Sequence, residues 1–589
     1  MKQIKQILLQ RRNEAVVAVR EALRKDPFYE EMSPVELEIR KPCNEGWFTS
    51  EPISGIDRRL EIFLPSNFPD VPPLIKLSGK ALDLFLNNPH VFKDGSICVL
   101  ANSASVDADK PVEVVQYCIR QSIEILTQNH SEDFRDEFSV YWNLDSGGDS
   151  KRFILVEPLT ILGSDCCSEL LDNYVVIGSS EHAITRWVSS FLGKQTHTGT
   201  IRPCIIVELN KPLLPSQYPN SIWDVREIVK CESPASLDSL DKLICDSTRF
   251  FTILFKQNGD GGSVLAGVVA IGQGLKKIKK IAGFRSGKAP KNLLITSGKT
   301  DLKKNVVDRG TVQRVDHNWI HTRGGDGADL ATKKILIIGC GSLGGYVAHL
   351  LARAGVGELM LLDNDKFEWE NVGRHVLGAS QIGLSKADAL RKKIQQELPH
   401  LCVNHFFGDW RNWIDQGNTE NFDSFDLVIS TVGDWSCERP LNILRKRKNS
   451  PPLLFGWIEP YGVAGHALLA GQSGGCMECG VNQYGHFSNK VAAFEKGTLT
   501  KEPGGCTYYQ EYGPLSVTPI AEMVSRLSID VMRGHSNSSE LRSWIGPISE
   551  IINHGGVISE FWENKVSNDS LSQTLGMSWI NRENCNVCS

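Results

Sequence analysis

Three glycines follow a pattern that could hold a phosphate group. Gly339, Gly341 and Gly344 come after a short apolar run at 335–338 and before apolar residues at helical spacing, and a second apolar run ends at Asp363. Glycines at the start of a helix let backbone N–H groups approach a phosphate, and an acid ending the next strand can accept bonds from ribose hydroxyls. The pattern predicts a nucleotide site. By itself it is also typical of the dinucleotide site of an oxidoreductase.

The polar residues that follow favour a triphosphate over a dinucleotide. An acid, an amide and two cations come at short intervals: Asp365, Asn371, Arg374 and Lys386. Extra cations at a phosphate site suit a triphosphate. Asp434 closes another apolar run, 425–431, and a carboxylate at the carboxyl end of a parallel strand is well placed to hold Mg²⁺. Arg439 and Asn442 follow on the helix that begins there.

As a combination, these motifs resemble the adenylating domain of ubiquitin-activating enzymes and of their bacterial ThiF/MoeB-type relatives, which activate sulfur-carrier proteins. The resemblance covers roughly residues 333–589. It implies that ATP is the substrate, that Asp363 anchors the ribose, and that Arg374 and Lys386 offset phosphate charge. Such domains work as twofold dimers in which an arginine before the first strand reaches the neighbouring subunit's phosphates. Arg323 is the candidate, and an ordinary surface arginine is the alternative.

The same resemblance assigns a thiol that attacks the acyl-adenylate. Cys506 lies in a glycine-rich segment before an amphipathic helix at 517–532, which matches the position of that thiol in the family. A free cysteine has a pKa near about 8.5, and a nearby helix or cation can lower it. Cys340, inside the glycine turn, and Cys437, beside Asp434, are the competing thiols; we expect tight packing to lock Cys340.

Two C-x-x-C pairs predict a structural zinc site in the C-terminal half. Each pair offers two thiolates from one tight turn, and four thiolates make a closed tetrahedral site. The pairs are Cys476 with Cys479 and Cys585 with Cys588. A redox role is the alternative, disfavoured because neither pair begins the helix of a βαβ unit.

The N-terminal part contains a second candidate thiol, Cys98. A helix, strand-like segments including 35–39, a proline-punctuated stretch at 65–73 and the turn Asp-Gly-Ser-Ile-Cys precede a helix at 111–126. This order resembles ubiquitin-conjugating enzymes and implies that Cys98 carries the modifier. Asn88 and His90 are the candidates for the oxyanion-stabilising amide or a structural turn bond, in an order that departs from the family. An inactive domain that only binds a partner is the alternative.

We predict that these residues are held by a multidomain α/β chain. Residues 1–148 form an α+β ubiquitin-conjugating-like domain, and residues 149–312 an α/β linker domain without a catalytic constellation. Residues 313–589 form a Rossmann-like ThiF/MoeB adenylation domain with a parallel-rich sheet, the crossover cysteine and the zinc site. The linker domain either sets the spacing of the two active domains or docks a substrate.

Composition narrows the class of protein. The chain has 589 residues, 16 cysteines and a net charge of −5 without a long basic run, so nucleic acid and membrane surfaces are not expected partners. We find neither a signal peptide nor an apolar stretch of the ~20 residues that a membrane span needs. We therefore expect a cytoplasmic protein whose cysteines are thiols or metal ligands rather than disulfides.

Together, the resemblances imply an activating and a conjugating enzyme fused in one polypeptide, as in bacterial type II CBASS antiphage systems. They imply a homodimer that adenylates a protein C-terminus, forms a thioester on Cys506, transfers the acyl group to Cys98 and ligates it to a target amine. In that family the carried protein is a CD-NTase, the enzyme that makes a cyclic oligonucleotide signal. The alternatives are a sulfur-carrier adenylyltransferase with a passive first domain, and an ATP-binding adaptor without chemistry.

Overall fold

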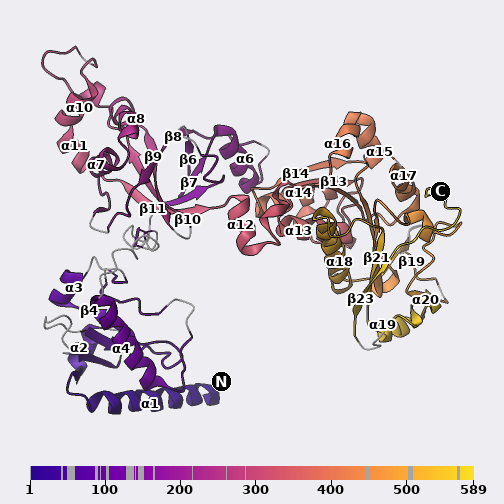
Figure 1. Ribbon diagram of the computed structural model, residues 1–589, viewed down its shortest axis with the longest axis horizontal. Helices are drawn as coiled ribbons and strands as arrows, with labels where there is room; N and C mark the ends of the chain where they lie inside the picture. Colours follow the sequence, from indigo (N-terminus) through magenta and orange to yellow (C-terminus); the bar gives the residue numbers. More distant parts are fainter. Residues whose placement is uncertain are drawn as a thin grey trace. The chain divides into compact units, whose positions relative to one another are not determined.

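A computed structural model gives the structure of the chain (Figure 1). It describes residues 2–588 except 41–43, 50–59, 86–89, 93, 101–104, 128–137, 139–140, 143–150, 163–165, 195, 215–216, 260–261, 286, 446, 448–449, 496, 502–507 and 567–570. Contacts group the chain into two compact units, one of residues 1–154, 163–177 and 200–313, the other of residues 155–162, 178–199 and 314–589. The three predicted domain ranges stay a prediction, because this grouping is coarser.

The N-terminal region combines helices with a small antiparallel sheet. The sheet has the order β1 (Tyr29–Glu31), β2 (Gly46–Thr49), β3 (Leu60–Phe63), β4 (Leu74–Leu77). The helices are α1 (Lys2–Arg24), α2 (Pro34–Ile39), α3 (Gly79–Phe85) and α4 (Pro111–Thr127). Apolar residues of α1, α4 and the inner sheet face, among them Val19, Ile62 and Ile119, form one buried core.

One expected strand in this region is wrong. Residues 35–39 belong to helix α2, although Val35 and Ile39 are typical strand residues. Ser33 caps this helix: its side chain accepts from the N–H of Glu36, and the Glu36 carboxylate accepts from the N–H of Ser33. With Pro34 at the first helical position, the capping box outweighs the propensity of the β-branched residues.

The middle of the chain forms a closed barrel with helices. The barrel order is β10 (Gly262–Ile271), β11 (Asp308–Arg314), β5 (Arg152–Leu155), β7 (Tyr174–Gly178), β6 (Cys167–Leu171), β8 (Arg202–Leu209), β9 (Phe250–Gly259). The helices are α6 (Glu181–Leu192), α7 (Ile222–Glu232), α8 (Pro234–Asp246), α9 (Leu275–Ile278), α10 (Lys291–Ser297) and α11 (Lys299–Lys304). α6 is grouped with the second unit, where it packs on α14 (Lys386–Glu397).

The C-terminal part is built on an eight-stranded sheet. Its order is β14 (Cys402–Phe407), β13 (Glu358–Asp363), β12 (Lys334–Ile338), β15 (Leu427–Ser430), β16 (Leu453–Ile458), β17 (Ala464–Ala470), β21 (Glu540–Ile545), β23 (Gln573–Ser578). The first five strands are parallel and the last three join antiparallel. Long apolar runs in β12 and β15 are buried on both faces, as a covered parallel sheet requires.

Helices complete this part of the chain. α13 (Ser342–Ala354) and α18 (Pro514–Met532) pack against each other and share a core with the sheet. The other elements are α12 (His317–Gly324), α15 (Trp410–Trp413), α16 (Thr419–Asp423), α17 (Trp435–Leu444), β18 (Ala492–Phe494), β19 (Thr500–Lys501), β20 (Tyr508–Tyr509), α19 (Ile548–Asn553), β22 (Gly556–Ile558) and α20 (Glu560–Glu563). Among the helices of the described residues, none is long and apolar enough to span a membrane.

Candidate functional site

The glycine turn between β12 and α13 has the geometry that its sequence predicts. Gly339 has φ +90°, a conformation that glycine adopts without steric cost. At Gly344, in the first turn of α13, an added Cβ would come within 2.0 Å of the Gly339 carbonyl oxygen, so only glycine fits there. At Gly341 an added Cβ would meet nothing within 4 Å, and no side chain caps α13. The first N–H groups of α13 are therefore left for a ligand.

Asp363 ends β13 and is bonded to this turn. Its Oδ2 accepts from the N–H of Cys340 at 2.6 Å, and its Oδ1 accepts from the N–H of Asp365 at 2.7 Å. Burial raises the pKa of Asp363 above its usual range, although these two bonds work in the opposite direction. Each carboxylate oxygen keeps a second lone pair for a further donor, as a ribose hydroxyl requires.

A cavity of about 340 Å³ opens at this edge of the sheet. Its lining includes six residues predicted from the sequence: Gly339, Gly341, Asp363, Asp365, Lys386 and Asp434. Lys386 begins α14 and its ammonium contacts Asp365 at 2.9 Å. Asp434 caps α17 by accepting from the N–H of Ser436 at 2.8 Å. The carboxyl ends of β12, β13 and β15 thus bring an open helix N-terminus, a cation and carboxylates around one space.

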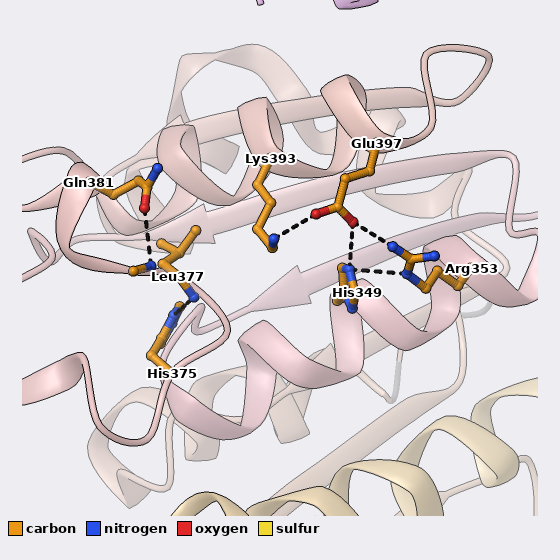
Figure 2. Close-up of polar contacts among 8 residues, drawn as sticks. His349, Arg353, His375, Leu377, Gln381, Lys393 and Glu397 are labelled. Atoms are coloured by element: carbon orange, nitrogen blue, oxygen red, sulfur yellow. Dashed lines mark hydrogen bonds and ion pairs between the residues drawn. The ribbon is translucent and has the colours of Figure 1, made fainter. Parts of the chain in front are cut away.

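His375 supports the glycine turn from behind, a role that sequence reasoning missed. Its Nε2 donates to the Cys340 carbonyl at 2.8 Å. Its Nδ1 accepts from the N–H of Leu377 at 3.0 Å (Figure 2). Burial lowers the pKa of His375 to about 4, which keeps the ring neutral with one donor and one acceptor. In the sequence, the only indication of this role was the position of His375 directly after the predicted ligand Arg374.

Glu397 fixes the far end of α14. Its carboxylate accepts from His349 at 2.8 Å, Arg353 at 2.8 Å and Lys393 at 2.6 Å, which links α14 to α13 (Figure 2). Burial opposes ionisation, but the bonds from Lys393 and His349 outweigh it and lower the pKa of Glu397 to about 2. The helix that carries Lys386 is therefore held at both ends.

The cavity also holds an arginine–aspartate pair that was not predicted. Arg411 donates to Asp409 through Nε at 2.8 Å and Nη2 at 2.7 Å, and both residues line the cavity beside Trp410. The pairing with Asp409 raises the pKa of Arg411 further above its ordinary range. The sequence Gly408-Asp-Trp-Arg after β14 carries no recognisable motif, so only the sheet order could place it here.

Four predicted ligands of the nucleotide lie outside the lining of this cavity: Gly344, described above, and three polar residues. The Arg374 guanidinium donates to the Gln510 carbonyl at 3.0 Å and lies 4.8 Å from the Tyr512 ring. The Asn371 side chain accepts from the N–H of Glu368 at 3.1 Å. Arg323, on α12, stacks over Trp319 at 3.2 Å. Their assignment to the nucleotide stays a prediction.

The predicted thiols differ in environment. Cys340 is fully buried, and burial raises the pKa of its thiol well above the ordinary value. Cys437 is half-buried in the cavity wall, and burial raises its pKa as well. Both shifts argue against a thiolate at neutral pH. Cys506 lies outside the described residues, so its role stays a prediction.

Cys98 lies in a short turn beyond β4. Its N–H donates to the His90 carbonyl at 2.8 Å, its thiol is half-buried, and Sγ lies 3.7 Å from the Leu100 carbonyl. His90 has φ +65° and its N–H donates to the Tyr141 hydroxyl. His90 is thus tied into the turn through its backbone. Asn88, the other candidate, lies outside the described residues.

The two C-x-x-C pairs converge as predicted. The four sulfur atoms lie within 4.8 Å of one another, with neighbouring pairs 3.6, 3.7 and 3.9 Å apart. Four thiolates at about 2.3 Å from a tetrahedral zinc would be about 3.8 Å apart. The Arg582 N–H lies 3.3 Å from Cys479 Sγ and Arg445 Nη1 lies 3.5 Å from Cys588 Sγ, as donors to thiolates do. This donor set fits zinc.

A serine, a histidine and a glutamate also form a connected set, but not a reachable one. His466 bonds Ser543 Oγ at 2.7 Å and Glu459 at 2.8 Å, and all three side chains are buried. Glu459 further accepts from the N–H groups of Val491 and Ala492. Because no substrate can reach the serine, we interpret this set as a structural link between β16, β17 and β21.

Comparisons with known proteins match both ends of the chain. Residues 318–545 match the ThiF family, and residues 35–149 match the Prokaryotic E2 family B. The protein named "ATP-dependent ubiquitin transferase-like protein Cap2" of Pseudomonas aeruginosa is 24% identical over 74% of this chain and 79% of its own length. The Vibrio cholerae protein of the same name is 25% identical over 56% of this chain and 58% of its own length.

More distant matches involve the C-terminal part. "Ubiquitin-like modifier-activating enzyme 5" of Mus musculus is 28% identical over 26% of this chain and 40% of its own length. A crystal structure of E. coli MccB with ATP matches 44% of this chain and 67% of that chain, at 16% identity and a TM-score of 0.30, too distant to bear on function. The chain combines a prokaryotic E2 family B domain with a ThiF-family domain in one polypeptide, and is a fused E1- and E2-like protein homologous to the proteins named Cap2.

Proposed function

We propose that the chain uses ATP to activate the C-terminal carboxylate of a protein and passes the acyl group over two cysteines to an amine. One observation carries this proposal: a cavity that joins an open helix N-terminus, Asp363, Lys386 and Asp434 lies in the ThiF-family part of a chain that also has an E2-like part with a half-buried Cys98. Relatives named as ubiquitin transferase-like and modifier-activating proteins support the same class of chemistry.

In the first step, the carboxylate attacks the α-phosphorus of ATP and pyrophosphate leaves. The N–H groups at the start of α13 bind phosphate oxygens, Lys386 offsets charge, and Asp363 orients the ribose. Holding the carboxylate against the α-phosphorus makes the reaction effectively unimolecular. Arg374 joins the phosphates only after it leaves the Gln510 carbonyl, so nucleotide binding competes with that contact.

Two metals accompany this proposal. The Asp434 carboxylate lies in the cavity wall and would hold Mg²⁺, which offsets phosphate charge when bound. The four clustered thiols would hold zinc, which ties the C-terminal residues to the 476–480 turn. Neither metal takes part in the thiol transfers.

The later steps rest on the thiols. Cys506 displaces AMP from the adenylate to form a thioester, Cys98 accepts the acyl group by transthiolation, and a lysine amine of the target receives it. We further propose a homodimer in which Arg323 reaches the partner's nucleotide. As in the CBASS systems that the chain resembles, the carried protein would be a CD-NTase, primed through its C-terminus for antiviral defence in the bacterial cytoplasm.

Exchange of labelled pyrophosphate into ATP tests the first step. We expect exchange only when a protein or peptide with the cognate C-terminus is present, and a loss of exchange in Lys386→Ala and Asp434→Ala, because each removes a group from the phosphate end of the cavity. An adaptor without chemistry would show ATP binding and no exchange with any tail. A sulfur-carrier adenylyltransferase would show exchange but no acyl group on Cys98.

A further inference from the structure

Helices α6 and α14 pack against each other in the same compact unit as the nucleotide cavity (Figure 1). A second cavity is lined by residues of both helices. Its volume is about 360 Å³, and it shares no lining residue with the nucleotide cavity. Four cations line it: Arg186 and Lys194 from α6 and its end, and Arg391 and Lys392 from α14. The hydroxyl-bearing residues Thr185 and Ser189 and the imidazole of His182 also line it, and none of the lining residues is acidic.

The walls of this cavity are fixed by packing. α6 ends at Gly193, which has φ +65° and whose N–H donates to the carbonyls of Ser189 and Ser190. Glycine is favoured at this cap because of its positive φ, and a Cβ there would meet only the flexible end of Gln396 on α14. α14 is itself held by Glu397. The concave shape is therefore part of the fold.

The cavity carries uncompensated positive charge. Arg391 and Lys392 share a single carboxylate, Asp388, at 2.7 and 2.8 Å. The side chains of Arg186 and Lys194 make no hydrogen bond or ion pair with any other residue that the structure describes. Cations that converge from two helices on one hollow repel one another, and an anion between them removes that repulsion. An ordinary solvated helix face would spread such charges instead.

The donors suit phosphate better than other anions. Guanidinium and ammonium groups with neighbouring hydroxyls match the several oxygens of a phosphate chain, and Arg forms bidentate bonds with them. Among the lining residues, His182 alone carries a ring, so the cavity offers a nucleobase little surface for stacking. We propose that this cavity binds a polyphosphate group, carried by a nucleotide or free as pyrophosphate. The site is independent of the proposed acyl transfer.

Hydrogen–deuterium exchange of the full chain with tripolyphosphate, pyrophosphate and ATP as probes tests the proposal. We expect each polyphosphate to slow exchange in residues 181–194, because α14 also carries Lys386 of the nucleotide cavity and would respond to ATP bound there. The double variant Arg186→Gln/Lys194→Gln should need at least about tenfold more probe for the same protection, since bonds to charged groups contribute about 1.5–3 kcal/mol. The control Lys230→Gln/Lys242→Gln makes the same charge change at exposed positions on α7 and α8 and should behave as the wild type.

The three probes separate the sources of the phosphate. Equal protection by tripolyphosphate and ATP would show that the cavity recognises the phosphate chain alone. Protection by ATP at a lower concentration than tripolyphosphate would show that it recognises a nucleotide. Both outcomes support the site. Protection that the double variant keeps, or no protection by any of the three probes at millimolar concentration, would overturn it. Pyrophosphate exchange into ATP, measured alongside, reports on the nucleotide cavity and leaves this result unaffected.

Discussion

The glycine turn and the turn around Cys98 each contain a cysteine whose backbone is held by hydrogen bonds. The two turns differ in how far they bury the thiol. Around Cys340, bonds to Asp363 and His375 fix the backbone, and the thiol is fully buried with a raised pKa. Around Cys98, the backbone is tied to His90, but the thiol stays half-buried. The first turn uses cysteine as a small packing residue, and the second leaves it within reach of a reactant.

The largest expected effect is on the transfer step. Cys98→Ala should reduce ligation to the target amine by about a thousandfold or more, because the variant has no sulfur to carry the acyl group. Tail-dependent pyrophosphate exchange should persist. Cys340→Ala should keep most of its ligation activity, since only a buried thiol is lost. A gel-based ligation assay with both variants measures this. Equal losses of ligation activity would contradict the proposed difference between the two cysteines.

The glycine turn can be broken selectively. Gly344→Ala forces a Cβ against the Gly339 carbonyl and should cost about 3 kcal/mol of unfolding free energy, together with nucleotide binding. Gly341→Ala meets no protein atom, so it should keep the wild-type unfolding midpoint and raise the KM for ATP by filling the open side of the turn. Denaturant unfolding and exchange kinetics separate the two. An unfolding loss in Gly341→Ala would show that our account of the turn is wrong.

The four clustered thiols extend the comparison to a third use of cysteine. Cys585→Ser, or a zinc chelator, should lower the unfolding free energy by about 2.7 kcal/mol when free zinc is otherwise a hundred times its Kd. Metal analysis should find one zinc per chain in the wild type and a loss in the variant. The control Cys231→Ser changes an exposed thiol and should have no effect. Unchanged stability on chelation would contradict a structural zinc site.

The smallest expected effect concerns acid. Burial lowers the pKa of His375 to about 4, so below about pH 6.5 the unfolded state binds more protons than the folded state. The stability that neutral His375 contributes is complete above that pH and is lost as the pH falls toward 4. This term is on the order of 2 kcal/mol at pH 5.

Unfolding midpoints of the wild type and His375→Gln between pH 7 and pH 4.5 measure this term. The wild type should lose more stability on acidification than the variant, because only it must protonate the ring beneath the glycine turn. Burial also lowers the pKa of His321 to about 4 and that of His400 to about 3. Both residues are present in the wild type and in the variant, so their contributions cancel in the difference between the two proteins. His535→Gln, at an exposed position, is the control. If the unfolding midpoints of the wild type and His375→Gln change with pH in the same way, His375 does not contribute to the acid sensitivity.

The sequence was most informative where local chemistry decides the structure. The glycine turn, Asp363 and Asp434 were predictable because a turn of this kind and strands that end in acids are local patterns. The approach of Cys476 to Cys585 was predictable because metal-ligand spacing constrains distant segments. Residues 35–39 were misassigned because strand propensity was weighed without the cap at Ser33.

Long-range contacts could not be predicted in the same way. His375 and Arg411 act through the order of the sheet and through single hydrogen bonds, which no local motif announces. Arg374 occupies a contact with the Gln510 carbonyl that is distant in sequence. The packing of α6 on α14, which creates the cationic cavity, joins segments that are distant in sequence.

The central claim is that one polypeptide makes an activated acyl group and carries it on sulfur. Peptide mass spectrometry of the full chain, incubated with ATP and a protein bearing the cognate C-terminus, tests it most directly. The account predicts ATP-dependent adducts on Cys506 and Cys98 that an added thiol such as dithiothreitol removes by accepting the acyl group, and in Cys98→Ala the adduct on Cys506 alone. An ATP-dependent transfer that proceeds with neither cysteine modified would contradict it.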